Sequence, residues 1–133
     1  MSLFNVFGIA GSGMSAQSVR LNLTASNLAN AQSVATRPQD AYRARHPVFQ
    51  AVLDGETGAG VRTTGIVQSD AKSEARYAPG HPLADDAGYV HAANVNTMEE
   101  MANMISASRS FQQNVEVMNT SKELLLRTLR LGE

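Results

Sequence analysis

The sequence predicts a mainly α protein in which long N- and C-terminal helices pair as an antiparallel coiled coil, with a small insert of β structure and loops between them. Three observations favour this fold class. Residues 1–36 contain one ionisable side chain, Arg20, in a chain that is 17% charged. Residues 97–131 carry an apolar heptad repeat. All four prolines and all three histidines lie between these segments, in residues 37–93.

The N-terminal segment, residues 1–36, has the pattern of a helix that is apolar on two faces. Seven apolar residues fall on two nearly opposite stripes, Met14, Leu21, Ala25 and Leu28 on one side and Ala16, Val19 and Leu23 on the other. Ser, Asn, Gln and Thr rather than Lys and Glu lie between the stripes, and uncharged polar groups are less costly to desolvate than ions. We expect this helix to begin after Gly11-Ser12-Gly13 and to be surrounded by other protein.

The middle segment, residues 37–93, reads as a small outer region of short strands and turns. Residues 48–53 and 61–67 are the best strand candidates, separated by a Gly-rich turn at 54–58, and residues 88–91 are a weaker third. The chain therefore divides into an N-terminal helix (1–36), this region and a C-terminal helix (94–133), and the two helices form one axial domain.

The C-terminal helix is expected over residues 97–131, a rod of about 50 Å. Thr97 and Glu100 fit a capping box, and we interpret Glu99 and Glu100 as charges that complement the helix dipole. Two core series follow a heptad, Met101, Ser108, Val115, Lys122 and Leu129 at one position and Met104, Phe111, Met118 and Leu125 at the other. An ordinary helical hairpin, whose apolar seams satisfy each other, is the alternative to a helix pair that needs further partners.

Composition excludes several classes of function. The net charge is −1 and no block of Lys or Arg is present, so we expect neither nucleic acid nor an anionic membrane as a partner. The absence of cysteine excludes disulfides and thiolate chemistry. The N-terminus has no basic region, which indicates that it is not a standard secretory signal, and no apolar run approaches the roughly 20 residues that cross a bilayer.

Candidate chemical sites are weak. Gly11, Gly13 and Ala16 match a loose dinucleotide fingerprint, but no acidic residue follows about 20 positions later, and a flexible helix start explains them better. A second candidate, a metal-ligating cluster of two histidines and two aspartates, matches no common site and reads as an exposed loop; it consists of His81, Asp85, Asp86 and His91. We therefore expect no enzyme, no cofactor and no metal.

The run from Ala25 to Ala31, Ala-Ser-Asn-Leu-Ala-Asn-Ala, resembles the signature of the bacterial flagellar axial proteins that form the rod, hook and filament cap. Further motifs resemble, in order and spacing, those of the proximal-rod proteins of the flagellar basal body: Ser2-Leu3-Phe4, Met14-Ser15-Ala16-Gln17, Tyr42-Arg43-Ala44-Arg45, Tyr77-x-Pro79-Gly80-His81-Pro82-x-Ala84-Asp85, Gly88-Tyr89-Val90, Asn94-Val95-Asn96, Glu99-Glu100-Met101, Met104-Ile105-Ser106-Ala107-Ser108-Arg109-Ser110-Phe111, Asn114-Val115-Glu116-Val117 and Thr128-Leu129-Arg130-Leu131-Gly132. The resemblance covers nearly the whole chain.

The resemblance implies a structural subunit that leaves the cytoplasm through the flagellar type III export apparatus, without a cleaved signal, and polymerises in the periplasmic space. Its terminal helices would form the inner layer of the rod around the export channel, against self-copies and other rod proteins. The expected assembly interface consists of Met14, Val19, Leu21, Leu23, Asn27, Leu28, Asn30, Met101, Met104, Phe111, Val115, Met118, Leu125 and Leu129. A helical-hairpin binding module or export adaptor without a polymer role is the alternative, and an enzyme is a distant third.

Overall fold

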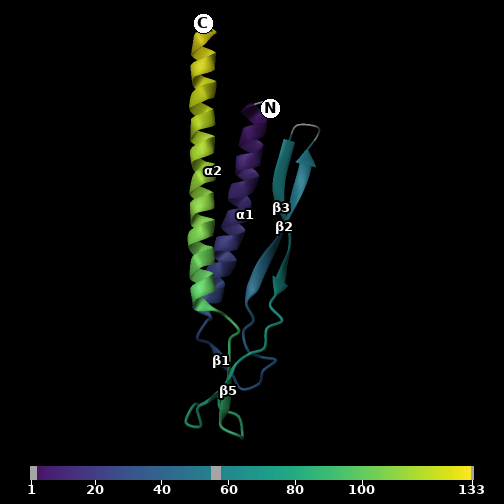
Figure 1. Ribbon diagram of the computed structural model, residues 1–133, viewed down its shortest axis with the longest axis vertical. Helices are drawn as coiled ribbons and strands as arrows, with labels where there is room; N and C mark the ends of the chain where they lie inside the picture. The colour runs from purple at the N-terminus through teal and green to yellow at the C-terminus, as the bar shows by residue number, and fades with distance from the viewer. Residues whose placement is uncertain (1–2, 55–57, 133) are drawn as a thin grey trace. The chain divides into compact units, whose positions relative to one another are not determined.

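The computed structural model describes residues 3–54 and 58–132, with a long helix at each end of the chain and five strands between them (Figure 1). In chain order the elements are α1 (Leu3–Ala29), β1 (Val34–Ala35), β2 (Arg45–Asp54), β3 (Gly58–Gln68), β4 (Ala75–Tyr77), β5 (Tyr89–Ala92) and α2 (Thr97–Leu131). The predicted fold class is wrong, because the middle of the chain is substantial: it forms two sheets, and one of them is a hairpin of β2 and β3, which hold 10 and 11 residues. The structure is therefore not a mainly α coiled coil with a small insert.

The chain divides into two compact units, and each draws on all three of the segments expected from composition. Unit 1 contains Met1–Leu21, Pro47–Gly65 and Ile105–Glu133, and unit 2 contains Asn22–His46 and Ile66–Met104. Both helices and both long strands continue from one unit into the other. Composition alone does not reveal this division, because it follows proximity in space.

In unit 1, the start of α1 packs closely against β3. The Ser12 hydroxyl accepts a hydrogen bond from the Val61 N–H at 3.1 Å and donates one to the Ile9 carbonyl at 2.8 Å. A Cβ on Gly60 would lie 3.2 Å from the same hydroxyl, so a glycine suits this approach of strand to helix. The expectation that the helix begins after Gly11-Ser12-Gly13 is wrong, because α1 already begins at Leu3 and runs through the three residues. Residues 55–57 of the expected turn lie outside the described residues.

Small side chains also mark the approach of α1 to α2 in unit 1. A Cβ on Gly13 would lie 2.9 Å from Nδ2 of Asn114, closer than atoms in real structures tolerate. Among the described residues of this unit, the buried ones are three alanines and a serine: Ala10, Ala16, Ala107 and Ser121. The helices therefore meet through small residues and leave most of the large apolar side chains out of the core.

The buried stripe of α2 differs from the predicted heptad at one of its two positions. Met104, Phe111, Met118 and Leu125 are half-buried, in the expected series. The other covered series lies one residue earlier than expected, at Ala107, Asn114 and Ser121, whereas Lys122 and Leu129 are exposed. The prediction chose the more apolar residues for the core, but close helix packing selects small ones.

Unit 2 contains a three-stranded antiparallel sheet in the order β1-β5-β4. Val34 pairs with Ala92 and Arg76 pairs with Val90, which is completely buried. The turn before β5 needs Gly88, whose φ of 83° is unfavourable for other residues and whose Cβ would lie 3.0 Å from the Tyr77 ring. β5 agrees with the weak third strand candidate to within one residue.

The first turn of α2 is capped differently from the prediction. The Asn96 side-chain carbonyl accepts from the N–H groups of Met98 and Glu99, at 3.1 and 3.3 Å, so Asn96 rather than Thr97 is the N-cap. Glu100 is not a solvated cap charge, because it is 3% exposed and receives a hydrogen bond from Asn27. The interpretation of Glu100 as a capping-box residue is therefore wrong.

Candidate assembly surface

The centre of unit 2 is a buried polar cluster around Asn27, which is 0% exposed. Its side-chain oxygen accepts from the Tyr42 hydroxyl at 3.0 Å and from the Arg45 N–H at 2.9 Å. Its amide nitrogen donates to the Arg45 carbonyl at 2.9 Å and to Oε2 of Glu100 at 3.1 Å. Since an asparagine side chain offers two donors and two acceptor positions, all of its capacity is used within the chain.

The two asparagines of the expected interface form hydrogen bonds within the subunit. Asn27 is part of the expected interface, but the structure uses it inside the subunit. Asn30 is half-buried, and its amide donates to the Ser26 carbonyl one turn earlier in α1 at 2.9 Å. The Asn-Leu-Ala-Asn run therefore has an internal structural use in this chain.

The other expected interface residues lie at intermediate depth or on the surface. Half-buried are Met14, Val19, Leu21, Leu23, Leu28, Met104, Phe111, Val115, Met118 and Leu125. Met101 and Leu129 are exposed. The half-buried residues support the fold of the subunit as well as any contact, so a charge at these positions would disturb both.

Among the described residues, α2 has more exposed large apolar side chains than any other element. Eight of its large apolar side chains are exposed: Met98, Met101, Ile105, Val117, Leu124, Leu126, Leu129 and Leu131. Three of them, Val117, Leu124 and Leu131, recur every seven residues, which places them on one line along the helix in unit 1. We call these three residues the α2 stripe. The prediction missed it, although the spacing of seven is visible in the sequence.

The exposed face of α1 has a different character. Along the helix, the exposed residues after Phe4 are small or short and uncharged: Gly8, Ser15, Ser18, Asn22, Ala25 and Ala29. These residues recur at intervals of three, four or seven, so they lie on one face. Such a face permits the backbone of another helix to approach closely.

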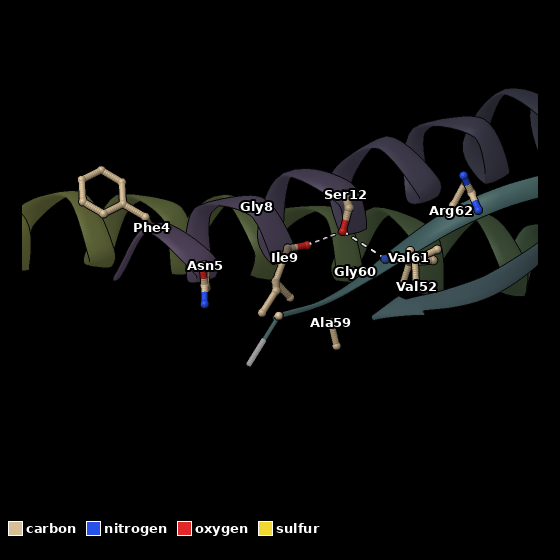
Figure 2. A pocket seen from close by; sticks show the side chains of 11 residues that line it. Phe4, Asn5, Gly8, Ile9, Ser12, Val52, Ala59, Gly60, Val61 and Arg62 are labelled. Carbon is tan, nitrogen blue, oxygen red and sulfur yellow. Dashed lines mark hydrogen bonds between the residues drawn. The ribbon is translucent and has the colours of Figure 1, made fainter. Parts of the chain in front are cut away.

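A groove of about 570 Å³ lies in unit 1 between the first turns of α1 and the hairpin (Figure 2). Phe4, Ile9 and Val52 contribute apolar surface, and Arg62 is the one charged residue among those that line it. Among the described residues that line the groove there is neither a carboxylate nor a histidine.

The histidine and aspartate residues of the candidate metal cluster serve the loop of unit 2. His81 Nδ1 accepts from the Leu83 N–H at 3.1 Å, and Asp85 Oδ1 accepts from the Tyr89 N–H at 2.8 Å. His91 Nε2 lies 3.9 Å from Asp85 Oδ2. Among the described residues, no group of three or more His, Cys, Asp or Glu side chains is placed to hold a metal ion.

Across residues 3–54 and 58–132, neither helix is both long and apolar enough to span a membrane.

Comparison with known proteins gives matches along the whole chain. Residues 7–34 match the family described as flagella basal body rod protein, and residues 86–131 match the C-terminal family of the flagellar basal body rod FlgEFG proteins. The chain is 53% identical over 134 residues to the flagellar basal-body rod protein FlgC of Yersinia enterocolitica. It is 49% identical to that of Salmonella typhimurium and 50% identical to that of Escherichia coli O157:H7, each over 134 residues. In all three comparisons the alignment covers 100% of both chains.

Proposed function

The chain belongs to the FlgC family of flagellar basal-body rod proteins, and we propose that it builds the rod by burying the exposed apolar surface of its two terminal helices against neighbouring subunits. It is a structural subunit of the flagellar basal body. The relatives are named as rod proteins and not as enzymes.

One observation supports assembly above all: the subunit buries small residues and exposes large ones. Among the described residues, the buried apolar side chains are six alanines and Val90, whereas α2 alone exposes eight large apolar side chains. Apolar burial stabilises by about 25 cal/mol per Å², and folding of the single chain does not bury these exposed side chains. A contact with another protein would bury them.

The α2 stripe and the small-residue face of α1 are the surfaces on which such contacts would form. Full burial of one Leu or Val side chain contributes about 1.5–3 kcal/mol. A head-to-tail contact that does not close into a ring repeats along a filament, so each subunit gains this contribution on more than one side. The neighbours in this proposal are copies of the chain and other rod proteins around the export channel.

The absence of cysteine and the small core suit a chain that is transported before it folds. We propose that the flagellar type III export apparatus carries it to the growing rod. A subunit with few large side chains in its own core has a low free energy of unfolding by itself. Its folded form gains further stability when neighbours cover its helices.

A charge placed on the α2 stripe tests this proposal. In a strain that lacks the protein, Leu124→Asp should be produced and exported, yet rods and swimming should be lost, because desolvation of an unpaired carboxylate costs several kcal/mol. Gln112→Asp is the matched control, since it adds the same charge at an exposed polar position of α2. Basal bodies imaged by electron microscopy, together with circular dichroism of the purified variants, separate failed assembly from failed folding.

Normal rods with Leu124→Asp would exclude the α2 stripe from the interface. Complete rods in the strain that lacks the protein would refute its role as a necessary rod subunit.

A further inference from the structure

The main chain of residues 44 and 45, where β2 begins, is held in unit 2 mostly by side chains. The Ala44 N–H donates to Oδ1 of Asn94 at 2.7 Å, and the Ala44 carbonyl accepts from the Ser69 N–H at 2.8 Å. Both main-chain groups of Arg45 bond to Asn27, its N–H to Oδ1 and its carbonyl to Nδ2, each at 2.9 Å. Two asparagine side chains thus supply three of these four hydrogen bonds, in place of the main-chain groups of a neighbouring strand.

Both asparagines are themselves fixed by distant parts of the chain. The second N–H of the Asn27 amide is held by Glu100 on α2, 73 positions away. The Asn94 amide donates to the carbonyls of Ser69 and Ala71, at 3.2 and 2.7 Å. The cluster is therefore complete only when α1, the start of α2 and the segment around residue 70 have come together.

We propose that Asn27 and Asn94 are positioning residues that make the extended conformation of residues 44–45 conditional on the pairing of α1 with the first turn of α2. These four hydrogen bonds join the main chain of Ala44 and Arg45 to residues distant in sequence. The extended conformation of the segment therefore depends on long-range contacts. Long-range contacts require closure of long loops before they form. The start of β2 orders after the helices meet and is released when they separate.

This inference concerns ordering within one subunit and does not depend on rod assembly. The pairing of the helices and the extended conformation at Arg45 are two coupled equilibria, and such coupling is reciprocal. A change that weakens the helix pair must therefore destabilise the extended conformation at Arg45, and a change at Arg45 must alter the stability of the helix pair.

Amide hydrogen exchange of the full chain, followed by NMR, tests the proposal. The reporter is the Arg45 amide, and the reference in the same unit is the Ala92 amide, which donates to the Glu74 carbonyl at 2.8 Å. In Asn27→Ala, protection of the Arg45 amide should fall about tenfold or more relative to the Ala92 amide. Asn30→Ala is the matched control, since it removes an asparagine directly after the same helix whose amide donates to Ser26 of α1, and it should leave this ratio unchanged.

A second pair of variants tests the coupling without touching Arg45 or its partner. Glu100→Ala removes the acceptor that orients Asn27, so Arg45 protection should fall relative to Ala92. Glu100→Gln keeps an acceptor oxygen and should retain most of the protection. A merely structural role for Glu100 would lower protection of Arg45 and Ala92 by the same factor, and this result would overturn the proposal.

The wild-type chain provides a measurement that does not rely on any variant's folding. In low concentrations of urea, the Arg45 amide should exchange through the same opening as the Glu100 amide, which donates to the Asn96 carbonyl at 3.0 Å in the first turn of α2. Equal urea dependence of the two amides supports the proposal. Exchange of Arg45 by a local opening without urea dependence would refute it.

Discussion

Replacing Gly13 by alanine tests how closely α1 and α2 approach each other in unit 1. In an open part of a helix, Gly→Ala stabilises by about 1 kcal/mol, because alanine loses less backbone entropy and has the higher helix propensity. At Gly13 the new Cβ would lie 2.9 Å from Nδ2 and 3.1 Å from Oδ1 of Asn114, so the amide must move.

The structure allows the cost of this displacement to be estimated. The Asn114 amide donates to the Ser110 carbonyl at 2.9 Å, and loss of this partly buried bond costs about 0.5–1.5 kcal/mol. The gain in propensity and the lost hydrogen bond are therefore of similar size, and Gly13→Ala should leave the free energy of unfolding nearly unchanged. Gly11→Ala is the matched control, because a Cβ at that position would meet no atom of another element within 4 Å, and it should stabilise by about 1 kcal/mol.

Urea unfolding followed by far-UV circular dichroism measures both variants under the same conditions. Combining Gly13→Ala with Asn114→Ala removes the side chain that must move, so the double variant should recover the full gain in propensity, and the double-mutant cycle should give a coupling of about 1 kcal/mol. If Gly13→Ala stabilises as much as Gly11→Ala, the close approach of the helices is refuted.

Three further results are expected. Asn27→Asp should destabilise the subunit itself by several kcal/mol at neutral pH, because it places a carboxylate against Glu100 and against the Arg45 carbonyl. Protonation of one of the two carboxylates relieves the repulsion in the folded state, so stability of this variant should rise as the pH falls, and a thermal melt that worsens in acid would contradict this. Gly88→Ala should destabilise by about 1–2 kcal/mol in a thermal melt, because φ is positive there, and an unchanged midpoint would count against that strain. Limited trypsin digestion of dilute protein should cut after Lys122, Arg127 and Arg130 before it cuts the sheets, since the side chains of residues 122–131 are mostly exposed; resistance of this segment in a proven monomer would contradict the expectation.

The sequence predicted the elements whose signals are local and long. α2 has the predicted bounds, 97–131, because its apolar period and the charges at its two ends indicate a helix over the same residues. The two hairpin strands contain the predicted segments 48–53 and 61–67, although each strand is longer than expected. β1 and β4, with two and three residues, have no signal of their own and exist because they pair with β5.

The errors arise where a distant partner overrides a local signal. Glu100 carries a good capping-box signal, but its partner is Asn27, and no local pattern indicates a contact across 73 positions. The glycines near residue 12 predicted a flexible start, whereas α1 runs through both of them, and Gly13 lies against Asn114 of α2. For the assembly surface, heptad spacing indicates α2 as a source of apolar contacts, and both this role and the assignment of the individual residues stay predictions.

The small-residue face of α1 has a consequence for the thermodynamics of any contact made there. Glycine and alanine have no side-chain rotamers to lose, whereas a buried leucine gives up about 0.5–1 kcal/mol of side-chain entropy. Gly8, Ala25 and Ala29 can therefore be covered almost without an entropic penalty, but they also contribute little apolar area. Recognition on this face must come from shape, because only a partner whose own backbone comes equally close gains van der Waals contact with it. The two helices thus differ in surface: α2 would contribute apolar burial to a contact, and α1 would select a partner by shape.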